Sequence, residues 1–241
     1  MKGRISLIAA FALGICLAVG PAHADLVFLG PGTLGGQGLG AVATVLTMTS
    51  PGSSSAESGC VAGGVGGVTV VGAGACPGAG PHGLPAFTGL DNIAINVARS
   101  ATSLGLTDFH DLRILFNADE PAANGITISN LSLTLWDPAN GQILDARYIA
   151  ASVPFASTNP GVGNAGFFFG LDNAQATGLN GILAAFPALV LGLSANATDA
   201  TGGPETFSLG ARTTTVPEPT TLVLLSFGLT AVSWMSRKRV R

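Results

Sequence analysis

The chain has 241 residues, enough for one domain of moderate size with a hydrophobic core. Hydrophobic residues make up 47% of it and charged residues 10%, which is too apolar for a disordered chain, and its 35 glycines are too many for a helical one. Between Asp25 and Thr215, four basic residues stand against twelve acidic ones, a formal charge of −8 that argues against nucleic acid as a partner, because phosphate binding needs clustered Arg and Lys.

The N-terminus has the pattern of a secretory signal peptide. Lys2 and Arg4 precede an apolar run of about 16 residues, and Ala22 and Ala24 occupy the small-residue positions of an Ala-x-Ala cleavage site. The alternative is a first transmembrane helix, but the run is short for a bilayer and ends in a cleavage signature. We expect export to remove residues 1–24.

Small residues dominate the start of the exported domain, where residues 41–48 favour a strand and residues 51–59 favour a loop. Cys60 and Cys76 then enclose fifteen residues, six of them Gly. In an oxidising compartment this pair predicts a disulfide, which stabilises by about 3 kcal/mol in the chain-entropy model. Metal ligation is the alternative, but no second Cys pair or close His pair completes a site.

The middle of the chain predicts a β-hairpin. Residues 112–116 and 126–136 alternate between apolar and polar side chains, and the second run slips phase once, which predicts a bulge or bend near Ser129-Asn130. The sequence DPANG at 137–141 favours a turn, because Pro fixes one φ and Asn-Gly supplies positive φ. A partner strand is expected over residues 143–149.

Further along, residues 165–171 read as a buried strand, and Asp172 can cap a helix that Pro187 ends. Its apolar face consists of Leu179, Ile182, Leu183 and Phe186. Residues 188–195 and 205–212 supply the last strands. The spacing of strands and Gly-rich turns predicts an all-β fold, an antiparallel β-sandwich of jelly-roll type with one short helix.

Residues suited to catalysis or metal binding are few. The densest polar cluster, DFHD at 108–111, could bind a cation or hold His110 beside two acids, but an exposed turn is the favoured interpretation. The Asp119-Glu120 pair and Asp137 with Asn140 could offer oxygen ligands to calcium, yet neither matches the spacing of a calcium loop, so solvated turns are again favoured. We expect no metal site and no cofactor.

The exported domain also has few aromatic residues on which a sugar could stack. Trp136 and Tyr148 are its Trp and Tyr, and both lie on the predicted hairpin. Core packing is the more common fate of an aromatic residue on a strand. A glycan-binding module therefore stays open as an alternative function.

The C-terminal tail combines three features. We expect the sequence VPEP, formed by Val216, Pro217, Glu218 and Pro219, to be extended because of its prolines. Sixteen uncharged residues follow at 220–235, and the chain closes on the basic residues Arg237, Lys238, Arg239 and Arg241. As a helix the run spans about 24 Å against a hydrocarbon core of about 30 Å, so a buried core helix is the alternative. The interfacial Trp234, the basic end and the terminal position favour a membrane segment.

This order of motif, apolar span and basic end resembles the PEP-CTERM sorting signal of Gram-negative bacteria, which integral-membrane exosortases read. The resemblance covers about 25 residues. It implies that the chain is an exosortase substrate, with the catalytic machinery elsewhere, and that it is associated with exopolysaccharide and biofilm-forming species.

We therefore expect a signal peptide at 1–24, an exported β-sandwich at 25–213 and a sorting signal at 214–241. The protein would be anchored in the inner membrane through residues 220–235 and, after processing, reach the cell surface or the medium. We expect its role to be non-enzymatic, within the envelope or the extracellular matrix. The alternatives are a glycan-binding module and, third, a glycoside hydrolase with an unrecognised site.

Overall fold

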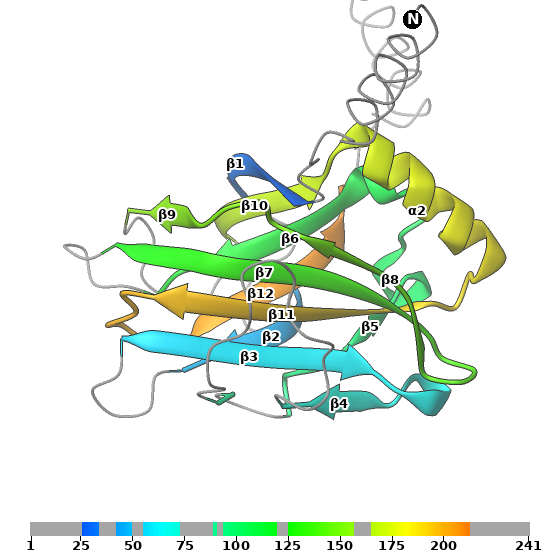
Figure 1. Ribbon diagram of the computed structural model, residues 1–241, viewed down its shortest axis with the longest axis horizontal. Helices are drawn as coiled ribbons and strands as arrows, with labels where there is room; N and C mark the ends of the chain where they lie inside the picture. Colours follow the sequence, from blue (N-terminus) through cyan, green and yellow to red (C-terminus); the bar gives the residue numbers. More distant parts are fainter. Residues whose placement is uncertain are drawn as a thin grey trace, which may run out of the picture. The chain divides into compact units, whose positions relative to one another are not determined.

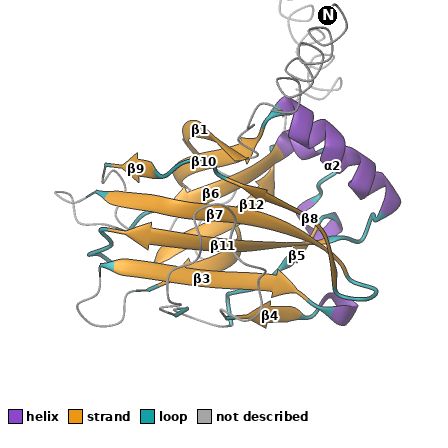
Figure 2. Ribbon diagram, in the orientation of Figure 1, coloured by secondary structure: helices purple, strands orange, loops and turns teal. Residues whose placement is uncertain are grey.

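The computed structural model describes seven stretches of the chain: residues 26–33, 42–49, 55–72, 89–90, 94–119, 125–156 and 165–212. The chain divides into two compact units, Met1–Ala211 and Arg212–Arg241, and every helix and strand named below lies in the first. Figure 1 shows two layers of strands with the helix α2 (Asn173–Ala185) beside them. Strands account for most of the described residues (Figure 2).

The first sheet has five antiparallel strands in the order β1-β10-β6-β12-β2. They are β1 (Leu26–Thr33), β10 (Ala165–Leu171), β6 (Leu112–Asn117), β12 (Glu205–Ala211) and β2 (Ala43–Met48).

The second sheet has seven strands, five of them in the order β4-β3-β11-β7-β8, again antiparallel. These are β4 (Thr69–Val71), β3 (Ala56–Gly63), β11 (Val190–Thr198), β7 (Ile126–Asp137) and β8 (Gln142–Tyr148). Two short strands complete it, since β5 (Arg99–Ser100) pairs with β11 and β9 (Val153–Phe155) pairs with β7. The predicted all-β class, with antiparallel sheets and a helix, is confirmed.

One hydrophobic core lies between the sheets. Phe116 on β6 and Phe207 on β12 stack in the first sheet with ring centroids 4.9 Å apart. The ring of Phe155, on β9 of the second sheet, lies 5.2 Å from that of Phe116, and all three side chains are buried. Burying a side chain of this size contributes about 1.5–3 kcal/mol, so these contacts hold the two layers together.

The predicted bulge in β7 is confirmed. Asn130 pairs with Asn196 on β11, but the next pair joins Ile128 to Ala197, so Ser129 is the extra residue. The bulge returns Ile128 to the inner face, where it is fully buried. The slip in the apolar pattern therefore has a structural cause in the sheet.

The predicted hairpin is also confirmed, with β7 and β8 antiparallel and joined by the turn at 138–141. Asp137 accepts at its Oδ1 atom from the N–H of Ala139, and its carbonyl accepts from the N–H of Gly141 at 2.8 Å. Gly141 has a φ of 70°, the left-handed conformation that a side chain disfavours. Turn chemistry that is legible in the sequence thus closes the hairpin, and a shift of register between Leu135 and Trp136 follows within the paired strands.

The helix α2 begins as predicted, because Oδ1 of Asp172 accepts from the N–H of Gln175 at 2.8 Å. Leu179 and Leu183 are buried, as the predicted apolar face requires. Phe186 is 36% exposed, however, because the helix ends at Ala185 and the residue after it has left the helical conformation. The expected apolar face is therefore one residue shorter.

Residues 56–59 correct the sequence interpretation, because they form part of β3 and not a loop. Small residues give this strand a weak pattern, yet nearly all of it is buried. At Gly59 a Cβ atom would lie 2.7 Å from Cδ1 of Leu46 on β2, across the core. Close approach of the two sheets needs a residue without a side chain here, which strand propensity does not reveal.

Candidate functional site

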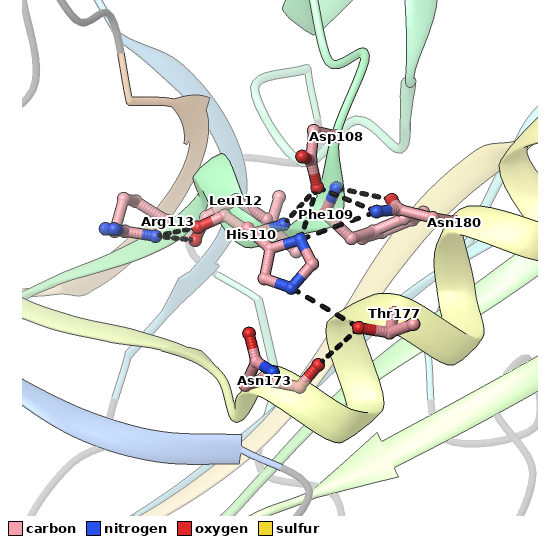
Figure 3. Close-up of polar contacts among 8 residues, drawn as sticks. All are labelled: Asp108, Phe109, His110, Leu112, Arg113, Asn173, Thr177 and Asn180. Atoms are coloured by element: carbon pink, nitrogen blue, oxygen red, sulfur yellow. Dashed lines mark hydrogen bonds and ion pairs between the residues drawn. The ribbon is translucent and has the colours of Figure 1, made fainter.

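The DFHD cluster lies where the 3-10 helix η4 (Phe109–Asp111) leads into β6, beside α2 (Figure 3). Asp108 is the N-cap of η4, and its Oδ1 atom accepts from the N–H of His110 at 2.8 Å. A short carboxylate two residues before a free N–H favours this local turn. The side chains of Asp108 and His110 are 47% and 37% exposed, so the expectation of an exposed turn is close to what the structure has.

His110 and Asp108 form an ion pair. Nδ1 of His110 lies 2.6 Å from Oδ1 of Asp108 and donates to it, because an ionised carboxylate can only accept. Hydrogen bonds from Asn180, from the backbone of His110 and from its side chain lower the pKa of Asp108 from 3.8 to about 2. The hydrogen bond to Asp108 in turn raises the pKa of His110 above 6.5, which favours the imidazolium.

Asn180 joins α2 to this turn. Its Nδ2 atom donates to Oδ1 of Asp108 at 2.8 Å, and its Oδ1 atom accepts from the N–H of Phe109 at 2.8 Å. One donor and one acceptor fix the orientation of the amide. Phe109 is fully buried, so Asn180 satisfies a backbone N–H beside the core. Asp108, His110 and Asn180, which we call the α2–η4 clamp, come from segments about 70 residues apart.

With Thr177, the cluster resembles a catalytic triad. Its Oγ1 atom lies 3.5 Å from Nε2 of His110, so a hydroxyl, an imidazole and the Asp108 carboxylate follow one another. The hydroxyl donates to the carbonyl oxygen of Asn173 at 2.8 Å, however, so its proton points away from His110. The donor and acceptor roles in these hydrogen bonds therefore indicate a structural clamp.

The other predicted oxygen ligands serve the backbone. The carbonyl of Asp119 accepts from the N–H of Gly203 at 2.7 Å, and Oδ1 of Asn140 accepts from the N–H of Gln142 at 2.8 Å. Glu120 is outside the residues that the structure describes. Within those residues, no three His, Cys, Asp or Glu side chains gather closely enough to hold a metal ion.

The hairpin aromatics divide between core and surface. Trp136 is 7% exposed, as expected for a core residue, whereas Tyr148 is half-buried. Neither presents a broad open ring. A sugar-stacking platform on the hairpin gains no support from these two residues.

Cys60 lies in β3, fully buried, and its sulfur takes part in a disulfide. Cys76 is outside the described part of the chain. The pairing of Cys60 with Cys76 therefore stays a prediction.

Sequence reasoning missed Asn180 and Thr177. Asn180 lies four residues after Ala176, which is fully buried, so its side chain borders the buried face of α2. A polar residue beside an apolar helical face is the signal that could have pointed to it. The partner on η4 could not have been named without the tertiary structure.

The predicted terminal sites lie outside the described residues. They are the cleavage site at Ala22 and Ala24, the VPEP sequence at 216–219, the apolar run at 220–235 and the basic end. In the stretches that the structure describes, no helix combines the length and apolar character that a membrane crossing requires.

Comparison with protein families gives a match to the PEP-CTERM protein-sorting motif over residues 215–239. Neither the comparison with curated proteins nor that with solved structures gives a match. The matched stretch contains the VPEP sequence and extends through the apolar run to Arg239. By this motif the chain is a PEP-CTERM domain-containing protein.

Proposed function

We propose that this chain is an exported protein that an exosortase sorts to the cell surface or extracellular matrix of a Gram-negative bacterium. Its β-sandwich would be non-enzymatic and associated with exopolysaccharide. The observation that carries the proposal is the sorting motif at 215–239. A motif with this role implies export, a membrane-anchored C-terminal signal and processing by the sorting enzyme.

The chemistry of the tail supports processing at the membrane. Pro217 and Pro219 would keep their segment extended, the conformation in which a protease cleft takes a substrate, and Glu218 would offer a charge for recognition. The apolar run and the basic end would hold this segment against the outer side of the membrane, with the basic end in the cytoplasm. The signal peptide predicted at 1–24 provides the matching export step.

We also infer that the sandwich is a jelly roll. The pairs β2–β12, β3–β11, β6–β10 and β7–β8 are nested in chain order, the first strand with the last and the innermost two with each other. This strand pairing is that of one long hairpin folded over into two sheets, which is the topology of a jelly roll. Lectin and capsid domains use that architecture without chemistry, although a fold alone does not assign a function.

A non-enzymatic role is supported by the α2–η4 clamp. Among the described residues it is the cluster that most resembles catalytic residues, yet Asp108, His110 and Asn180 bond to one another, and the Thr177 hydroxyl donates to its own helix. A nucleophile would need that proton to move toward a neutral imidazole. The hydrogen bonds stabilise the docking of α2 instead.

The test is to map both ends of the mature protein by mass spectrometry in cells with and without the sorting enzyme. We expect an N-terminus at Asp25 in both strains and loss of the Arg237–Arg241 end only where the enzyme is present. Full-length protein in the envelope of both strains would contradict the proposal. A glycan-binding role is the second candidate, and a cleft in the sandwich favours it.

A further inference from the structure

A cleft of about 500 Å³ opens at one end of the second sheet, within the size range of small-ligand sites. It lies where β7, β9 and β3 meet the turn between β11 and β12, at the left-hand end of the strands in Figure 1. Its lining includes Ser55, Thr127, Pro154, Phe155, Asp199 and Thr201. No part of the α2–η4 clamp borders it among the described lining residues.

One wall of the cleft is polar and held by the backbone. Ser55, Asp199 and Thr201 are exposed, and Thr127 is half-buried. Between Asp199 and Thr201, Ala200 is buried and its N–H donates to the carbonyl of Ser55 at 3.0 Å. The turn is therefore anchored to the start of β3, which holds the backbone of Asp199 and Thr201 in place before any ligand arrives.

Asp199 has a φ of 66° and is the one non-glycine residue with positive φ in the described part of the chain. This left-handed conformation favours glycine, although Asp tolerates it better than most residues do. Strained positions of this kind occur more often at ligand sites than elsewhere. A carboxylate is thus kept at a position where glycine would fold more easily.

The other wall is apolar. It contains Pro154, which is exposed, and Phe155, whose ring lies 5.3 Å from that of Phe28 in an edge-to-face contact. Phe28, on the edge strand β1, is 45% exposed. Phe28 is outside the described lining and Phe155 itself is buried, so Pro154 supplies the accessible apolar surface of this wall.

The charges in the cleft indicate the class of ligand. The described lining has hydroxyl groups and one carboxylate, with no Lys, Arg or His. Phosphate, sulfate or a uronic acid would meet a carboxylate with no cation to pair with, which is unfavourable. A ring with hydroxyl groups at its edge and C–H groups on its face matches one polar and one apolar wall.

We propose that this cleft binds a neutral saccharide. Asp199 accepts hydrogen bonds from two of its hydroxyl groups, and the side chains of Ser55, Thr127 and Thr201 bond to others. Pro154 contacts its apolar face. The assignment of the saccharide to an extracellular polymer rests on the proposed function, whereas the ligand class rests on the cleft alone.

The test uses mature protein purified from its own host. An array of neutral hexose, uronic acid and sulfated oligosaccharides is probed first, and the strongest neutral binder is then titrated by calorimetry. We expect Asp199→Gly to lower affinity about tenfold or more, because a charged hydrogen-bonding group is lost while the backbone relaxes. Thr201→Val, which keeps the shape, should lower it about threefold to tenfold. Asp111→Asn on η4 removes the same charge outside the cleft lining and should change nothing.

Several results would overturn the inference: no binding to neutral oligosaccharides, stronger binding to acidic ones, or unchanged affinity in both cleft variants. A calcium titration that depends on Asp199 without any saccharide would replace it with a cation site. None of these results affects the mapping of the mature ends. A sorted protein that binds no neutral sugar would sink this inference alone, and an unsorted protein that binds one would sink the proposed sorting alone.

Discussion

The two ends of the sandwich use polar side chains in opposite ways. At the α2–η4 clamp, Asp108, His110 and Asn180 bond to one another. At the cleft, Asp199 and Thr201 are exposed and line an open space, and the carboxylate of Asp199 accepts one long hydrogen bond, at 3.4 Å, from the hydroxyl of Thr198. Two clamp residues, Asp108 and His110, belong to the densest polar cluster of the sequence, whereas the polar residues of the cleft are dispersed along the chain. In this chain, a dense polar cluster in the sequence therefore marks a structural contact. Polar residues that lie far apart in the sequence line the proposed binding site instead.

The largest expected effect tests whether the α2–η4 clamp and the cleft are stabilised by the same hydrophobic core. Phe207→Ala removes a ring that stacks on Phe116 at 4.9 Å, and truncation of a buried Phe costs about 3–5 kcal/mol of unfolding free energy. Denaturant unfolding combined with hydrogen exchange should show α2 and the cleft turn losing protection together. Val65→Ala, at a residue that is 64% exposed, is the control and should cost under about 0.5 kcal/mol. Independent unfolding of one end would contradict a shared core.

The next effect distinguishes the contribution of the α2–η4 clamp to stability from that of the cleft. Asn180→Ala removes two hydrogen bonds and leaves the N–H of Phe109 without its side-chain partner, so it should lower the unfolding free energy by about 1–3 kcal/mol. In a protein of this size, that lowers the thermal midpoint by several degrees, about 2–4 °C per kcal/mol. Thr201→Val at the cleft should stay within about 0.5 kcal/mol. Equal losses in the two variants would show that the cleft residues are structural as well.

The pH dependence of stability should belong to the clamp. His110 has a raised pKa, so its contribution is complete below 6.5 and is lost as the pH rises through the folded value. Asp108 has a lowered pKa, so its contribution is complete above 3.8 and is lost as the pH falls through about 2. Thermal midpoints should be measured for the parent and for His110→Gln across this pH range. The parent should exceed the variant by the most between about pH 4 and pH 6.5. A constant difference between parent and variant would refute the ion pair.

The smallest effect concerns the hydroxyl beside His110. Because the Oγ1 atom of Thr177 donates within its own helix, Thr177→Val should change the unfolding free energy by less than about 0.5 kcal/mol. The pKa of His110, followed by NMR, should stay in place. A marked shift of that pKa would mean that the hydroxyl is coupled to the imidazole and would reopen the catalytic interpretation.

The sequence predicted those parts of the fold whose signals are local. The cap at Asp172, the turn at Gly141 and the bulge at Ser129 each depend on residues within a few positions, and all three are confirmed. The strand β3 was missed because small residues are buried there by the facing sheet, as Gly59 against Leu46 illustrates. Local propensity carries no information about such contacts.

The site was less predictable than the fold. DFHD was singled out, and its preferred interpretation as an exposed turn was close, but Asn180 comes from a helix about 70 residues away. The cleft residues have no pattern at all in the sequence, since the chain brings Ser55, Thr127 and Asp199 together only through strand pairing. The sequence was most informative in the C-terminal tail, because the residues of the sorting motif form one continuous stretch.

The central claim is that the C-terminal tail is a sorting signal and more than a membrane anchor. The most direct measurement is the mass of the C-terminal peptide in a host that has an exosortase, for the parent chain and for a variant with Pro217→Ala, Glu218→Gln and Pro219→Ala. These changes leave the apolar run at 220–235 intact, so a plain anchor would behave alike in both. We predict that the parent loses its Arg237–Arg241 end, whereas the variant keeps it and accumulates in the inner membrane. Identical processing of the two proteins would contradict the account.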